Sequence, residues 1–322
     1  MMRFIRDQLK RTGAGKDVIG LDIGCSAITC VVLEGSEFSY KLKHYGVEVI
    51  SPEIKSRGIK ASEQVITCIK RLLAATDVLS KHCAIALPDS VVTSQWIRID
   101  CSAAEDIEIA VNLALEQHVP HPLDDIYSDY QVFDSPYEDK SYLDVFLVAC
   151  RKEQVDVRLQ IIQQANLIPL FIEINSYAIK RAYTQLYPED LMKTSILVDI
   201  GFTHLTLSFF GEAKQIRNYS ESMINRVGKE AILQRVQQCL STLYFAYPYY
   251  KFSKLVFTGS NYPLLAFLVK KLTGLYELKI EILSHNNLLR CADDDNKKDF
   301  ITLFPALFLS FGLALRGLTF SM

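Results

Sequence analysis

The sequence predicts an α/β protein with two duplicated domains, each a β-sheet with helices packed on it. The first observation is a phrase that occurs twice: residues 19–26 read IGLDIGCS and residues 196–203 read ILVDIGFT. The second is that a further β-rich run follows each phrase, at residues 27–33 and 205–210, which predicts a hairpin with a glycine-containing turn. The third is the length of 322 residues, which allows two domains with a core each.

The repeated phrase also predicts a site. Glycine lets backbone N–H groups approach a phosphate, and an aspartate at the end of a strand can hold a hydrated Mg²⁺. Two such hairpins that face each other across a cleft would clamp one nucleotide from both sides. The candidate residues are Asp22, Gly24, Cys25 and Ser26 in the first hairpin, Asp199, Gly201, Phe202 and Thr203 in the second, and Thr258, Gly259 and Ser260 in a turn after a later strand.

The order of these three turns resembles the actin-like ATPase superfamily, and further segments narrow the resemblance to one of its families. Residues 110–133, AVNLALEQHVPHPLDDIYSDYQVF, resemble the helix, proline-rich turn and strand of the PilM family. Residues 143–175 resemble the strand, helix and strand unit that follows, and residues 310–317, SFGLALRG, resemble the closing helix. The resemblance extends over about positions 17 to 317.

PilM proteins are cytoplasmic components of type IV pilus machines, and they bind the N-terminal tail of the inner-membrane protein PilN. The resemblance therefore implies a cytoplasmic protein at the inner face of the bacterial inner membrane, with a PilN-like partner. It also implies ATP and Mg²⁺ as cofactors, the metal being held through water by Asp22 and Asp199. We expect the partner's extended peptide in a groove beside an inserted lobe, with these candidates: Val119, Pro120, Pro122, Ile126 and Tyr130.

The elements follow from the pattern of apolar residues. Residues 18–33 and 40–50 read as strands, and residues 62–75 place apolar side chains at helical spacing. Strands at 91–99, 127–132 and 142–150, with a helix before the second and another after the third, predict the inserted lobe. The resemblance gives these boundaries: a basic tail at 1–16, subdomain 1A at 17–81 and 167–193, inserted subdomain 1C of the FtsA and PilM type at 82–166, domain 2 at 194–300, and a C-terminal helix at 301–322 that returns to the first domain.

Three departures from the family pattern weaken the expected nucleotide site. The first turn continues with Ala27, Ile28 and Thr29, whereas many PilM proteins place a basic residue there. The turn at 258–260 carries less glycine than is usual. Subdomain 2B, which helps to cover the nucleotide, is reduced to about residues 218–252. We therefore expect a weak or vestigial ATP site and at most a weak ATPase, and no catalytic residue is identified.

Composition excludes several other classes. A formal net charge of -2 argues against a general nucleic-acid binder. The 8 cysteines form no C-x-x-C pair, which favours buried thiols over a zinc site or disulfide framework. His118 and His121 flank Pro120 in a rigid turn, so a metal site there is not expected. Residues 300–315 carry no charge but fall short of the roughly 20 that span a membrane, so we expect a buried helix.

Some alternatives stay open. A second function is a phosphoryl-transfer enzyme, a small-molecule kinase of the same superfamily, and a third is a filament-forming protein similar to FtsA. Homo-oligomerisation is undecided. The basic tail reads equally as a contact with an anionic membrane or as a solvated terminus. The aromatic run at 244–252 reads as a partner surface or as local core.

Overall fold

The computed structural model describes residues 17–36, 39–51, 62–76, 78–100, 107–134, 142–188, 194–202, 204–210, 216–223, 228–284 and 297–318. The predicted basic tail at 1–16 and Thr203 lie outside this set. The described strands form two five-stranded sheets and one three-stranded sheet.

The first sheet has the strand order β3-β2-β1-β4-β8, in which β1 to β3 are antiparallel and β4 and β8 run parallel to β1. Helices α3 and α5 pack on one face of it, and α6 and α9 pack on the other. The bounds are β1 (Ile19–Ile23), β2 (Ala27–Ser36), β3 (Ser39–Val49), α3 (Ser62–Ala75), β4 (His82–Leu87), α5 (Lys152–Gln164), β8 (Ile168–Ile174), α6 (Asn175–Leu186) and α9 (Lys297–Leu318).

The second sheet repeats this plan with the order β11-β10-β9-β12-β13, so the predicted duplication is confirmed. Its apolar core lies under α7 and α8. The strand β11 was not predicted, because it falls in the stretch assigned to a reduced subdomain 2B. The bounds are β9 (Thr194–Ile200), β10 (His204–Phe210), β11 (Ile216–Ser222), α7 (Lys229–Ala246), β12 (Phe252–Gly259), α8 (Tyr262–Leu272) and β13 (Lys279–Ile282).

The inserted lobe is a three-stranded sheet, β5-β7-β6, with α4 packed on one face. It is smaller than the predicted 82–166. Strand β4 belongs to the first sheet, where its nearly continuous burial is typical of a central parallel strand. Helix α5 places Val155, Ile161 and Ile162 in the core of the first domain. The lobe elements are β5 (Val92–Asp100), α4 (Ile107–His118), β6 (Ile126–Asp134) and β7 (Tyr142–Arg151), with short 3-10 turns at Asp89–Val91 and Leu123–Asp125.

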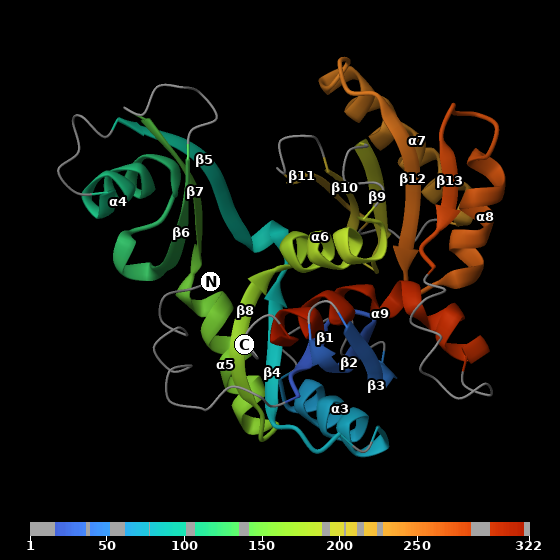
Figure 1. Cartoon of the computed structure of the whole chain (residues 1–322), viewed down its shortest axis with the longest axis horizontal. Coiled ribbons are helices and arrows are strands. Elements are labelled where there is room, and N and C mark those ends of the chain that lie inside the picture. The colour runs from blue at the N-terminus through green and yellow to red at the C-terminus, as the bar shows by residue number, and fades with distance from the viewer. Residues whose placement is uncertain are drawn as a thin grey trace.

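Helix α9 lies between the two domains beside α6, and the lobe is set to one side (Figure 1). Residues 299–318 are long and apolar enough to cross a membrane by length and composition, but 67% of that window is buried inside the protein. Phe304, Phe308 and Phe311 form the core with α6 and with side chains from both sheets. The apolar character of α9 is therefore explained by packing, as the sequence predicted.

Candidate functional site

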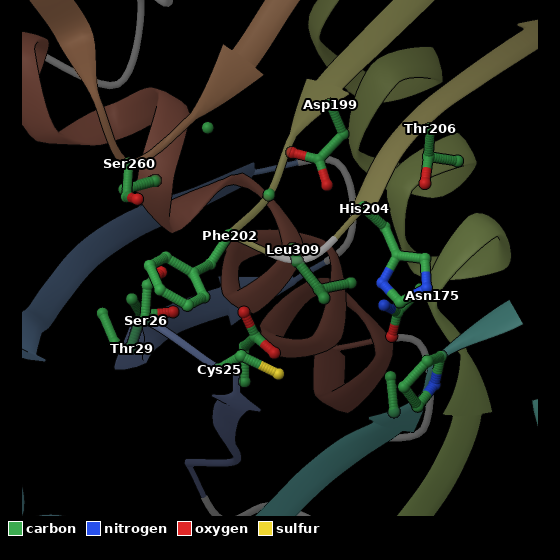
Figure 2. A pocket seen from close by; sticks show the side chains of 18 of the residues that line it. Cys25, Ser26, Thr29, Asn175, Asp199, Phe202, His204, Thr206, Ser260 and Leu309 are labelled. Carbon is green, nitrogen blue, oxygen red and sulfur yellow. The ribbon is translucent and has the colours of Figure 1, made fainter. Parts of the chain in front are cut away.

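A cavity of about 320 Å³ lies between the two domains, at the end of β1 and β9. Both hairpins line it, together with the turn after β12 and one side of α9. Figure 2 shows Asp199 on one side of this space and Cys25 and Ser26 on the other. The predicted nucleotide residues that line it are Asp22, Gly24, Cys25, Ser26, Asp199, Gly201, Phe202, Thr258, Gly259 and Ser260.

The two glycines of the repeated phrase have a turn-forming role. The Gly24 N–H donates to the carbonyl of Ala27 at 3.1 Å, and the Gly201 N–H donates to the carbonyl of His204 at 3.0 Å. A Cβ at Gly24 would lie 2.8 Å from that carbonyl oxygen, so the turn requires glycine. Since each glycine N–H is used inside its own hairpin, contacts to a phosphate must come from the residues that follow.

Asp22 and Asp199 carry unusual carboxyls. Burial raises the pKa of each to about 7; the Arg158 guanidinium opposes the shift at Asp22, and the charges of Asp22 and Asp89 add to it at Asp199. The described residues contain no group of three or more His, Cys, Asp or Glu that could hold a metal directly. Both aspartates line the cavity, and their role in holding a hydrated Mg²⁺ through water stays a prediction.

Arg158 is a functional candidate that sequence reasoning missed. This side chain of α5 is buried and lines the cavity. Its charge acts on both Asp22 and Cys25 of the first hairpin, and its own pKa is lowered by burial. The first hairpin itself carries no cation. The cavity nevertheless has one, supplied by a helix more than a hundred residues further along the chain.

The third predicted turn is partly structural. The Thr258 hydroxyl donates to the carbonyl of Pro305 at 2.6 Å, so this buried side chain fastens β12 to α9. Gly259 has φ +139, and a Cβ there would lie 2.5 Å from the carbonyl oxygen of Ile200. Ser260 is the exposed member of the turn. The hydrogen of the Thr258 hydroxyl is therefore used in the contact with α9.

Asp89 joins the two domains beside the cavity. Its carboxylate accepts a hydrogen bond of 2.9 Å from the Asn218 amide on β11 and one of 3.3 Å from the Ser176 N–H in the first turn of α6. Burial raises the pKa of Asp89, and the bonds from Ser176 and Asn218 oppose that shift. The contact between Asp89 and Asn218 is a polar link that spans the cleft.

A second groove of about 170 Å³ lies between the first domain and the lobe. Of the predicted partner residues, only Tyr130 lines it. Val119 and Ile126 are buried in the lobe core under α4. Pro120 and Pro122 are exposed in the turn after α4 and do not line the groove. These four positions therefore do not line the groove: two face the lobe core, and two lie in the exposed turn after α4.

The groove has a charged base and aromatic walls. The Arg181 guanidinium donates to both carboxylate oxygens of Glu173, and Arg316 Nε lies 3.0 Å from the same carboxylate. The Phe146 ring lies 5.5 Å from that of Tyr177 and 5.1 Å from that of Trp96. Glu173 lies in this groove and does not line the interdomain cavity.

Residues 20–222 match the family described as type IV pilus assembly protein PilM. The chain belongs to the PilM family. A solved structure described as a PilM-PilN type IV pilus biogenesis complex covers 94% of this chain and 98% of its own, with 18% identity and a TM-score of 0.76. At this identity the likeness shows the fold, and it supports the actin-like α/β architecture of two sheets with helices.

Two further structures are similar over shorter or looser alignments. A Bacteroides thetaiotaomicron protein with an actin-like ATPase fold and unknown function has 10% identity, covers 90% of this chain and 98% of its own, and has a TM-score of 0.46. A third similar structure is the cytoplasmic domain of EpsL, an inner-membrane component of the Vibrio cholerae type II secretion system. It has 10% identity, covers 76% of this chain and 82% of its own, and has a TM-score of 0.47. Scores below 0.5 support no conclusion about this PilM chain.

Proposed function

We propose that this PilM-family chain is a cytoplasmic assembly platform of a type IV pilus or related secretion complex. It binds the N-terminal tail of a PilN-like inner-membrane protein, and this partner holds it at the inner face of the bacterial inner membrane. The observation that carries the proposal is the groove between the lobe and the first domain, in a chain that belongs to the PilM family. The solved PilM of similar fold is in a complex with PilN.

The groove suits an extended peptide for a topological reason. Strand β8 is the last strand of the first sheet and β6 is the last strand of the lobe sheet, so each has an edge without a neighbouring described strand. Residues 172–174 and 129–131 of these two strands line the groove. An extended segment placed there can pair with an edge through its backbone and insert alternate side chains between the walls. Affinity then comes from the backbone and specificity from the pockets.

The walls and base of the groove indicate the chemistry of the peptide. Phe146 and Tyr177 offer aromatic surface to apolar side chains, which large aromatic residues bind well at interfaces. At the base, two guanidinium groups share the single carboxylate of Glu173. The surplus positive charge favours a peptide oxygen, from a carbonyl or an acidic side chain, near Arg181 and Arg316.

We further propose that the interdomain cleft binds Mg-nucleotide weakly and is at most a weak ATPase. The cleft offers the two aspartates and the hairpins, but Phe202 occupies the second turn and Thr258 is engaged with α9. Figure 2 shows the Phe202 ring directed toward Ser26. Between β11 and β12 the described chain contains only α7, in keeping with a reduced subdomain 2B. The family match to PilM favours this function over a small-molecule kinase.

The proposal is tested by capture from native membranes. A tagged form of the chain should recover a PilN-like inner-membrane protein without added nucleotide. A Phe146→Asp variant, which places a charge in the aromatic wall, should lose it, whereas Phe245→Ala on the exposed end of α7 should not. Recovery of no pilus or secretion component by the unmodified chain would overturn the proposal.

A further inference from the structure

We infer that Arg158 binds the phosphate groups of a nucleotide or polyphosphate on the first-domain side of the cleft. The inference rests on the proposed nucleotide site. It adds to that site a phosphate-binding cation that the sequence of the first hairpin does not contain. It also explains how a hairpin without its own basic residue can still accept an anion.

The burial of Arg158 is the first observation. Only 7% of the residue's surface is exposed, yet it lines the cavity. Its hydrogen bonds go to one neighbour on the same helix, the carbonyl of Gln154 at 2.7 Å and the side chain of Gln154 at 3.5 Å. Among the described residues no carboxylate lies within ion-pair distance of it. Both bonds come from Nη1, so the Nε and Nη2 donors of the guanidinium stay available to water or to a ligand in the cavity.

An arginine buried without a paired carboxylate is energetically unfavourable unless something else compensates it. Burial lowers the pKa of Arg158, and the nearby Cys150, Cys25 and Asp22 oppose that shift. An anionic ligand in the cavity would supply both charge and acceptors. Phosphate suits the planar fork of arginine, which binds two of its oxygens at once.

The position of Arg158 is the second observation. Its charge acts on Asp22 and Cys25, which belong to the first hairpin, so it lies on the side where that turn would meet a phosphate. Of the described residues that line the cavity, Arg158 is the sole arginine or lysine, against the carboxyls of Asp22, Asp89 and Asp199. With a hydrated Mg²⁺ held by the aspartates, Arg158 would contact the phosphate chain on the first-domain side, beside Asp22.

A purely structural alternative is that Arg158 only offsets the charge of Asp22. That role requires no ligand and predicts that phosphate affinity is independent of residue 158. The two roles are separated by titrating three probes into the full chain by calorimetry: tripolyphosphate, ATP and adenosine, each with Mg²⁺. The variants are Arg158→Met, Arg158→Lys and the control Arg151→Met, an exposed arginine next to α5.

The inference predicts that Arg158→Met weakens ATP and tripolyphosphate about 10- to 100-fold, the range for lost charge-assisted hydrogen bonds. Adenosine affinity should be unchanged, Arg158→Lys should recover part of the loss, and Arg151→Met should match the unmodified chain. If the methionine variant unfolds, the lysine variant distinguishes the phosphate-binding role from the structural one. Its ATP affinity should fall and its adenosine affinity should not.

Equal ATP affinity in the unmodified chain and the variants would overturn the role of Arg158 and leave the cleft intact. An equal loss of adenosine would show a general distortion and overturn it also. If the unmodified chain binds neither ATP nor tripolyphosphate, the nucleotide site fails together with Arg158. Capture of the PilN-like partner in the same preparation then shows whether the platform function fails as well.

Discussion

The Arg181 guanidinium on α6 donates hydrogen bonds of 2.7 Å to each carboxylate oxygen of Glu173 on β8. Arg181 also donates to the carbonyl of Gly312 on α9 at 3.0 Å, and Arg316 of α9 approaches the same carboxylate. One acidic side chain therefore holds a strand and two helices together at the base of the groove. The geometry is bidentate and partly shielded from water, which makes it stronger than a surface ion pair.

We predict that Glu173→Gln lowers the free energy of unfolding by about 1–3 kcal/mol, because two arginines lose their shared carboxylate. Partner capture should weaken with it. Urea denaturation measures the first effect. The control is Lys43→Met, which breaks the exposed pair with Asp17 and should leave stability unchanged within error. An equal effect of the two substitutions would contradict the importance given to the Glu173 cluster.

The link between Asp89 and Asn218 gives a prediction about domain movement. Asn218→Asp places a second carboxylate opposite Asp89, and the repulsion should open the cleft. Because burial raises the pKa of Asp89, the repulsion should grow with pH, and amide hydrogen exchange in β11 and in the first turn of α6 should rise more at pH 8 than at pH 5. Tyr219→Ser, an exposed neighbour on β11, is the control. Identical exchange in the two variants would show that the link does not hold the domains.

The pKa of Asp199 gives a prediction about pH. A carboxyl with a pKa of about 7 in the folded protein, against about 4 in the unfolded chain, binds more protons when folded between those values. Its contribution to stability therefore falls as pH rises from about 4 to 7 and is constant above. Asp199→Asn removes this effect.

From pH 5 to pH 8 the free energy of unfolding of the unmodified chain should fall by about 1–3 kcal/mol more than that of the asparagine variant. Urea denaturation of both chains at both pH values measures this difference. Asp124→Asn, at an exposed aspartate, should show no such difference. If Mg-ATP binds in the cleft, Asp199→Asn should also weaken it. A stability difference between the two chains that is equal at pH 5 and at pH 8 would refute the raised pKa.

The contact of α9 with β1 gives a prediction about packing. A Cβ at Gly20 would overlap the carbonyl of Ser310, so the helix must move if any side chain is present. Gly20→Ala should lower the free energy of unfolding by more than about 3 kcal/mol, as overpacking does in a rigid interface. Thermal unfolding compares it with Gly228→Ala, whose nearest neighbour is a flexible side-chain end at 3.7 Å. Similar melting temperatures for both would contradict this account of α9.

Local patterns in the sequence predicted the duplicated sheets and the position of the cleft. The repeated phrase was sufficient to place the cleft, because β1 and β9 are the central strands of their sheets and the turns that follow them line the same cavity. Strand β11 escaped prediction because its sequence, IRNYSES, is largely polar. Strand β4 was given to the wrong unit because a short apolar run does not reveal which sheet it joins.

The residues that sequence reasoning missed come from distant segments. Arg158 enters the cleft from a helix that reads as an ordinary amphipathic one, and Asp89 meets Asn218 across 129 residues of chain. No local spacing encodes such contacts. Two of the partner candidates lie away from the groove for another reason: Val119 and Ile126 are apolar positions that the lobe core requires. Exposure in the folded protein, which decides a docking surface, depends on the packing of α4.

The central claim is that the groove binds the tail of a PilN-like partner. The most direct measurement is titration of a synthetic peptide of the cognate partner's cytoplasmic tail, followed by fluorescence of Trp96, the single tryptophan, which contacts Phe146 at the groove. We predict a change in emission and roughly micromolar affinity without nucleotide, at least about tenfold weaker in Phe146→Ala and unchanged in Phe245→Ala. No binding by the unmodified chain, or equal affinity in Phe146→Ala, would contradict the claim.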